Sequence, residues 1–169
     1  MIENSVRIYR PELQTRRPEL LAWGLAVASL LGLLLLNLGG MIFFWSLVFV
    51  VFLFFAALSI SLGNWMDRRT QISIDNSGVT FQNGLRNVRL DWLIINNVKV
   101  VPSRWGEKVQ VIGPKSHFEF NTLGEVVFQQ KVQGQVGFQQ GKLLLDEIIH
   151  KSGLTSVAKN GDSYYYSRP

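Results

Sequence analysis

The sequence predicts a membrane α-helical hairpin followed by a mainly β domain, an antiparallel β-sandwich or barrel closed by a C-terminal helix. Three observations support this fold class. Two long apolar runs without charges lie before residue 63, apolar and polar residues alternate from Thr70 onward, and a helical pattern comes after the alternation. The expected divisions are an N-terminal segment 1–19, a two-helix segment 20–66, a β domain 67–153 and a flexible tail 154–169.

Each apolar run is long enough to cross a lipid bilayer. The first, 20–38, would form roughly 28 Å of helix at 1.5 Å per residue, which is close to the hydrocarbon thickness. The second, 41–62, is slightly longer and is expected to cross back with some tilt. Neither run contains an acidic residue, a basic residue or a histidine. Ion transport is therefore not expected, because it normally needs such groups inside the membrane.

The charges that flank the two runs predict their orientation. Four arginines precede the first run and two, Arg68 and Arg69, follow the second, whereas the connection between the runs carries no charge. By the positive-inside rule, both termini should lie on the cytoplasmic side of a bacterial inner membrane, or on the stromal side of a thylakoid membrane. Trp23 and Trp65, together with the two arginines, are the expected interfacial anchors.

Gly24, Ala28 and Gly32 form a face of small residues on the first helix. Small residues at a spacing of four allow helices to approach closely in lipid. The pattern leaves two interpretations open: this face packs against the second helix, or it docks onto a larger membrane complex. The phenylalanines of the second helix occupy nearly its whole circumference, which slightly favours docking.

Strand patterns fill most of the region after the second run. Ile72 and Ile74 alternate with polar residues, and the turns 76–78 and 83–84 separate the first three strands. Roughly seven short strands are expected in total, enough to form a small sandwich or barrel. A helix over 139–152 should follow them, with Gly153 as its C-cap.

The residue inventory argues against an enzyme, a metal site and a bound cofactor. The chain has no cysteine, which excludes disulfides, zinc–thiolate sites and cysteine nucleophiles. Its two histidines, His117 and His150, have no second histidine at ligand spacing. No phosphate-binding glycine loop or nucleophile motif is present. The net charge of +5 is spread along the chain and forms no patch of the kind that binds nucleic acid.

Two polar-aromatic segments are candidate binding surfaces. Arg104 and Trp105 lie in an expected loop, where the indole would either anchor a partner or fold back to cap the β domain. The other segment is the tyrosine triplet 164–166, which would dock onto a partner or remain unused in the tail.

The strand region resembles a known family. Its "I-x-I-D" hairpin, glycine turn and "W-x-x-I" stretch resemble the opening strands of bacterial pleckstrin-homology-like (PH-like) domains in membrane proteins. The matching positions are Ile72, Ile74, Asp75, Gly78, Val79, Gly84, Trp92, Ile95 and Val98. The order of elements, with an Asp67–Arg68 pair after the second helix, also resembles thylakoid assembly factors that help to build photosystem I. The resemblance implies a PH-like β domain and an accessory role in a photosynthetic membrane.

These observations lead to two functional expectations of different kinds. The first is a non-enzymatic membrane-anchored adaptor, assembly factor or accessory subunit of a larger membrane protein complex, for example a photosystem or its assembly intermediate. The alternative is a membrane-tethered PH-like module that binds anionic lipid or a small ligand. Five cations are the expected headgroup contacts in that case: Arg86, Arg89, Arg104, Lys108 and Lys115.

Overall fold

The computed structural model describes residues 6–12, 16–39, 44–104, 106–128 and 131–169, with the backbone alone for 127, 128, 131 and 133. The chain forms two compact units. The hairpin unit is Thr15–Met66, and the β unit combines Met1–Gln14 with Asp67–Pro169. The β unit is therefore built from two stretches of chain that are far apart in the sequence.

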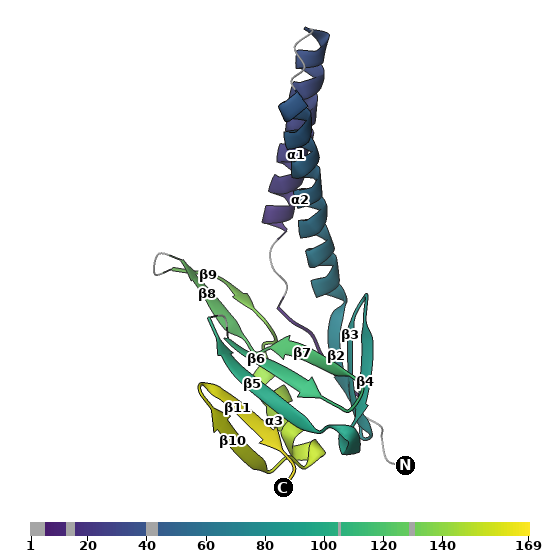
Figure 1. Ribbon diagram of the computed structural model, residues 1–169, viewed down its shortest axis with the longest axis vertical. Helices are drawn as coiled ribbons and strands as arrows, with labels where there is room; N and C mark the ends of the chain where they lie inside the picture. The colour runs from purple at the N-terminus through teal and green to yellow at the C-terminus, as the bar shows by residue number, and fades with distance from the viewer. Residues whose placement is uncertain (1–5, 13–15, 40–43, 105, 129–130) are drawn as a thin grey trace. The chain divides into compact units, whose positions relative to one another are not determined.

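The hairpin unit contains two long helices, which confirms the predicted pair. Helix α1 spans Arg17–Leu38 and helix α2 spans Phe44–Arg69 (Figure 1). Both are long and apolar enough to cross a membrane, and only 6% and 11% of their apolar windows are buried within the protein. This is consistent with a two-pass membrane hairpin. Both helices extend beyond the predicted 20–38 and 41–62, and residues 41–43 lie outside the described residues.

Small residues form the contact between the two helices. Ala26 of α1 and Ala57 of α2 are fully buried, and Val50 is 5% exposed. Alanine at such a contact lets two backbones approach closely, which strengthens van der Waals packing in lipid.

The first sheet of the β unit has the strand order β1-β2-β3-β4, and all its neighbours are antiparallel. Its turns fall at the two predicted positions, which confirms the opening meander. The strands are β1 (Arg7–Tyr9), β2 (Thr70–Ile74), β3 (Gly78–Asn83) and β4 (Asn87–Asp91).

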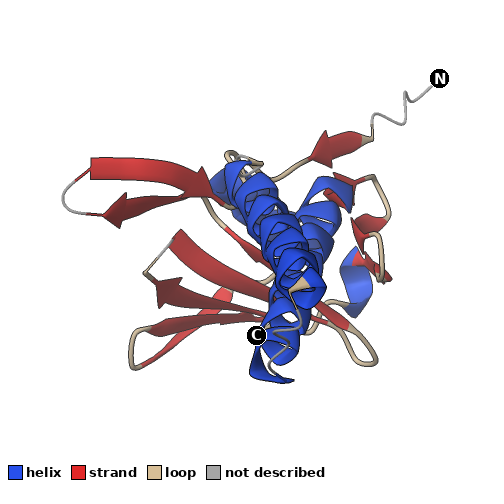
Figure 2. Ribbon diagram, turned by 90° about the horizontal axis from the view of Figure 1, so that it is seen from above, coloured by secondary structure: helices blue, strands red, loops and turns tan. Residues whose placement is uncertain are grey.

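A five-stranded antiparallel sheet with the order β10-β11-β5-β6-β7 forms the second layer. Among the described residues, β8 and β9 form a separate two-stranded sheet, with a register shift between Val126 and Val127. Figure 2 shows how strands, in red, make up most of the β unit. The strands are β5 (Asn97–Ser103), β6 (Gly106–Ile112), β7 (His117–Asn121), β8 (Gly124–Phe128), β9 (Lys131–Val136), β10 (Ser156–Asn160) and β11 (Ser163–Ser167).

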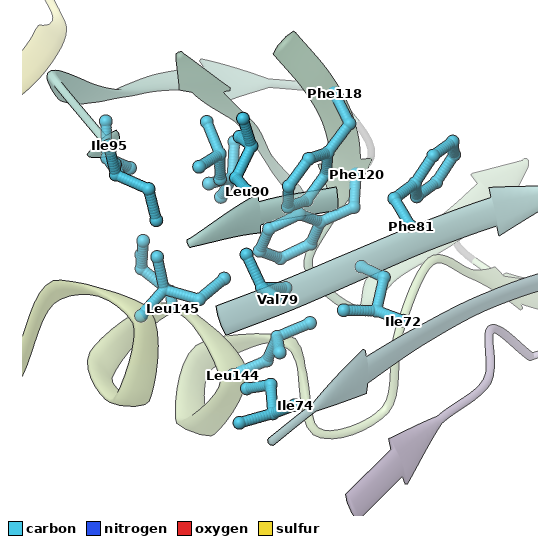
Figure 3. Packing of buried hydrophobic residues seen from close by; sticks show 14 of the residues in the cluster. Ile72, Ile74, Val79, Phe81, Leu90, Ile95, Phe118, Phe120, Leu144 and Leu145 are labelled. Atoms are coloured by element: carbon cyan, nitrogen blue, oxygen red, sulfur yellow. The ribbon is translucent and has the colours of Figure 1, made fainter. Parts of the chain in front are cut away.

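The two sheets share one hydrophobic core with helix α3 (Gly141–Ser152). The Phe81 ring of β3 stacks on the Phe118 ring of β7, with 5.4 Å between the ring centroids. Leu144 of α3 is fully buried in the same cluster (Figure 3). Ile148 of α3 is fully buried there too. Burying such side chains stabilises the fold by about 1.5–3 kcal/mol each. The structure thus has a mainly antiparallel β region with a covering helix, and it shows no closed barrel in the described residues.

Helix α3 begins at Gly141, two residues after the predicted start. Its backbone lies close to Thr122, where a Cβ on Gly141 would come within 2.7 Å of the Thr122 Cα atom. Only glycine permits this approach. Gly153 adopts the left-handed conformation at the C-cap, with φ of 69°, as predicted.

The segment 154–169 is not a flexible tail, and that prediction was wrong. It forms a hairpin, β10–β11, and β11 pairs with β5 so that Tyr166 lies opposite Val98. The turn places Gly161 at φ of 60°, a conformation that glycine adopts readily. The N-terminal segment 1–19 likewise supplies strand β1, which the sequence did not predict. A three-residue strand has no resolvable periodicity of its own and depends on pairing with β2.

Candidate functional site

A polar network joins α1 to α2 near one end of the hairpin unit. The Trp23 indole N–H donates to the Ser61 hydroxyl at 2.8 Å, and that hydroxyl donates to Glu19 at 3.0 Å. The Asn64 amide donates to the other carboxylate oxygen of Glu19 at 2.8 Å. The Trp23 ring also meets the Phe54 ring edge to face at 5.9 Å. The predicted interfacial anchor Trp23 therefore uses its N–H group inside the hairpin.

The small-residue face lies outside the contact between α1 and α2. Gly24 and Ala28 are each two residues from the buried Ala26, a rotation of about 200° around the helix. A Cβ added at Gly24 or at Gly32 would have no atom of the protein within 4 Å. The interpretation that this face packs against the second helix is wrong, because Ala26 and its neighbours make that contact. Docking of the face onto another protein stays a prediction.

The aromatic face of α2 is similarly exposed. Four phenylalanines are each more than half exposed, whereas Phe54 contacts Trp23. The exposed ones are Phe44, Phe49, Phe52 and Phe55. Among the described residues of the hairpin unit, the apolar surface is therefore turned outward on both helices.

Four arginines from three separate stretches of chain line one pocket of the β unit, with a volume of about 490 Å³. We call it the arginine pocket. Arg68 and Arg69 end α2, Arg10 follows β1, and Arg86 belongs to the turn between β3 and β4. The remaining lining residues are Gln71, Gln82, Gly84, Leu85 and Asn87.

Local hydrogen bonds fix the walls of the arginine pocket. Gln71 donates to Gln82 at 2.9 Å across the β2–β3 register. In the β3–β4 turn, the Asn83 side-chain oxygen accepts from the backbone N–H of Arg86 at 2.8 Å. The Arg86 guanidinium donates to the backbone carbonyl of His117 at 2.6 Å. These bonds hold the turn and the neighbouring strands in position around the pocket.

The five cations expected to contact headgroups do not come together. Arg86 lines the arginine pocket, but Arg89 pairs with Asp75 at 3.1 Å and Lys108 pairs with Glu119. Arg104 and Lys115 are exposed elsewhere on the unit. Arg10 was missed, because no local pattern shows that it would join Arg86 once β1 pairs with β2.

A second polar cluster connects β1 to α3. Glu147 accepts from the Tyr9 hydroxyl at 3.0 Å and pairs with Lys151 at 3.1 Å and Arg7 at 3.6 Å. Burial alone would raise the pKa of Glu147, but the hydrogen bonds from Lys151 and Tyr9 and the two positive charges outweigh it and lower the pKa. Burial, followed by the contact with Glu147, raises the pKa of Tyr9. The cluster fastens the N-terminal strand to the helix.

The other predicted site residues are placed as follows. Trp105 lies outside the described residues, so its two interpretations stay predictions. Arg104 is exposed, and Trp65 is 39% exposed on α2. His117 lies at the start of β7 and His150 lies on α3. Within the described ranges, no three acidic or histidine side chains are grouped so that they could hold a metal ion.

No family model matches the chain. No curated protein and no solved structure matches it either.

Proposed function

We propose that the protein is a non-enzymatic membrane-anchored adaptor, an assembly factor or accessory subunit of a larger membrane protein complex. The observation that carries this proposal is the small-residue face of α1, which the partner helix leaves uncovered. In lipid, such a face allows close packing of a further transmembrane helix. The hairpin would bring the client complex and the β unit to the same membrane surface.

The flanking arginines support an orientation in which both termini lie on the cytoplasmic or stromal side. The two antiparallel sheets and the covering helix α3 support a PH-like assignment for the β unit. The resemblance to thylakoid assembly factors makes a photosystem, or its assembly intermediate, the first client to look for. The bacterial inner membrane is the other location that the resemblance implies.

Mild-detergent purification of the tagged full-length protein from its native membrane tests the proposal. The variant Gly24→Leu/Gly32→Leu fills the small-residue face, and we expect recovery of the client to fall by about tenfold, as for loss of a close helix contact. Val27→Phe is the control for enlarging an exposed side chain of α1, because Val27 is 46% exposed and lies about 100° around the helix from Ala28. Recovery of the wild-type protein without any larger complex would contradict the proposal. Equal losses with both variants would show that the small-residue face is not the docking surface.

A further inference from the structure

The arginine pocket is lined by basic and neutral residues in the part of the chain that the structure describes. Its nine lining residues include four arginines and three side-chain amides, and none of them is acidic. Several guanidinium groups around one hollow favour the binding of an anion there. Guanidinium groups are also the donors best suited to phosphate, because they offer parallel N–H groups at the spacing of two phosphate oxygens.

Two of the four arginines have an explanation that needs no ligand. Arg68 and Arg69 lie in the last turn of α2, where cations are favoured by the helix dipole and by the positive-inside rule. The helix dipole favours neither Arg10 nor Arg86, because both lie outside the helices. Arg10 follows a strand that comes before both helices in the chain, and Arg86 lies in a β turn, yet both line the same hollow. The convergence of three chain segments therefore points to a ligand.

The chain itself indicates the source of that ligand. Arg68 and Arg69 follow the apolar part of α2 directly, so a hairpin inserted in a bilayer holds them at the depth of the lipid headgroups. Anionic lipids present phosphate at this depth and attract nearby arginines. A compact hollow of about 490 Å³ suits one headgroup, whereas a nucleic-acid duplex is usually bound along an extended basic stripe.

We propose that the arginine pocket binds the phosphate of an anionic lipid headgroup. Arg10 and Arg86 supply recognition, and Arg68 and Arg69 supply charge where the chain leaves the membrane. The amide groups of Gln71, Gln82 and Asn87 add neutral hydrogen-bonding groups around the headgroup. The proposal needs membrane insertion of the hairpin, but it does not depend on the adaptor function or on any client protein.

Thermal unfolding of the full-length protein in neutral detergent micelles tests this binding. Phosphatidylglycerol or phosphatidic acid is titrated into the micelles, with phosphatidylcholine as the zwitterionic comparison. We expect the two anionic lipids to raise Tm in a saturable way and phosphatidylcholine to leave it unchanged. In Arg10→Gln and Arg86→Gln, the apparent affinity should fall by about fivefold for each arginine removed.

Lys142→Gln is the control for the substitutions, because it removes the same charge from an exposed position outside the pocket and should leave the affinity unchanged. Arg10→Gln by itself is sufficient if Arg86→Gln, which also loses the bond to the His117 carbonyl, fails to fold. Equal affinity of Arg10→Gln and wild type would overturn the proposal. So would an equal loss in Lys142→Gln, which would indicate attraction by net charge alone.

Inorganic phosphate distinguishes the lipid from a soluble ligand. Inorganic phosphate is added alone, at the concentration of lipid phosphate that saturates the rise in Tm. It should raise Tm little, because it is not attached to the micelle. Stabilisation by inorganic phosphate equal to that by the anionic lipids, and lost in Arg10→Gln, would assign the pocket to a soluble phosphate and overturn the lipid proposal.

Discussion

Asp75 organises the first turn of the β unit through four hydrogen bonds. One carboxylate oxygen accepts from the N–H and hydroxyl of Ser77 and from the N–H of Gly78, each at 2.7 Å. The other oxygen accepts from Arg89 at 3.1 Å. The hydrogen bond from the Ser77 side chain, with the two backbone N–H groups and the Arg89 charge, lowers the pKa of Asp75 to about 2. The turn thus depends on an ionised carboxylate.

Replacing Asp75 should make the free energy of unfolding of the β unit change less with pH in the acid range. Asp75→Asn keeps an acceptor for the turn but loses the charge, and we expect it to reduce the free energy of unfolding at pH 7 by about 1 kcal/mol. Because the folded pKa lies below the ordinary 3.8, the charge stabilises the fold above about pH 4, and this contribution is lost as the pH falls toward 2. The difference between wild type and Asp75→Asn should therefore shrink over that interval.

Urea unfolding of the full-length protein in neutral detergent, measured at pH 7 and at pH 2.5, checks this expectation. Asp162→Asn is the control, since Asp162 is an exposed carboxylate in the β10–β11 turn. A difference between Asp75→Asn and wild type that stays the same at both pH values would show that the lost charge is not its cause.

At this scale the sequence is informative where a residue acts on its near neighbours. Asp75 contacts residues two and three positions away, so the turn could be predicted from its residue types. The Tyr9–Glu147 bond joins residues 138 positions apart, and no local pattern indicates it. The arginine pocket has the same character, because it requires residues 10, 68, 69 and 86 to meet after folding.

The β10–β11 hairpin shows how an element can be present without a clear periodic signal. Its three adjacent tyrosines pair with β5, and Tyr166 is partly buried against the core. The Tyr165 ring lies 5.2 Å from the Lys99 ammonium group. The turn residues Asn160 and Gly161 are the signal that could have found this hairpin, because such pairs are common between antiparallel strands. Pairing with β11 leaves β5 inside the sheet instead of at its edge.

Tyr166→Ala should destabilise the β unit by about 2 kcal/mol, because it removes an aromatic ring packed on the core. Tyr164→Ala is the matched control on the same strand, and the more exposed Tyr164, at 38%, should cost less than half as much. Denaturant unfolding measures both losses, and amide hydrogen exchange of residues 163–167 should accelerate more in Tyr166→Ala. Equal effects of the two substitutions would mean that β11 is held by backbone pairing alone.

The two apolar helices illustrate a different limit of prediction. Their existence follows from composition, because uncharged runs of this length are typical of membrane spans. The face through which they contact each other does not follow from composition. Gly24, Ala28 and Gly32 have the spacing expected of a close contact, yet they lie away from α2. The bonds from Ser61 and Asn64 to Glu19 fix one rotation of α1 relative to α2, and Ala26 becomes the buried small residue.

For the whole molecule, the division into an apolar pair of helices and a β region was visible in the sequence because each has its own composition and period. The assignment of residues 6–12 to the β unit was not. These residues are separated from β2 by the entire hairpin unit, yet β1 pairs with β2 and Tyr9 packs on the core. The β unit therefore contains sequence from both sides of the hairpin unit.

This arrangement predicts that residues 6–12 stabilise the β unit even when the hairpin unit between them and β2 is replaced by a linker. A chain that begins at Asp67 should fold, because the core residues of β2–β7 and α3 are all present, but it should be less stable than one in which 6–12 is rejoined through a flexible linker. We expect a difference of about 1–2 kcal/mol. It comes from the β1–β2 pairing, burial of Tyr9 and the hydrogen bond from Tyr9 to Glu147.

Urea unfolding of the two chains at pH 7 measures the difference. Tyr9→Ala in the rejoined chain is the control, and it should remove most of the gain, because Tyr9 supplies both the packing and the hydrogen bond. The gain in stability from residues 6–12 should also diminish in acid. The pKa of Glu147 is lowered in the folded protein, so its charge stabilises the fold at neutral pH, and this contribution is lost when acid protonates the carboxylate. Equal unfolding midpoints for the two chains would show that β1 is only an addition to the edge of β2. A gain that survives Tyr9→Ala would instead place it in the backbone pairing of Arg7–Tyr9 with β2.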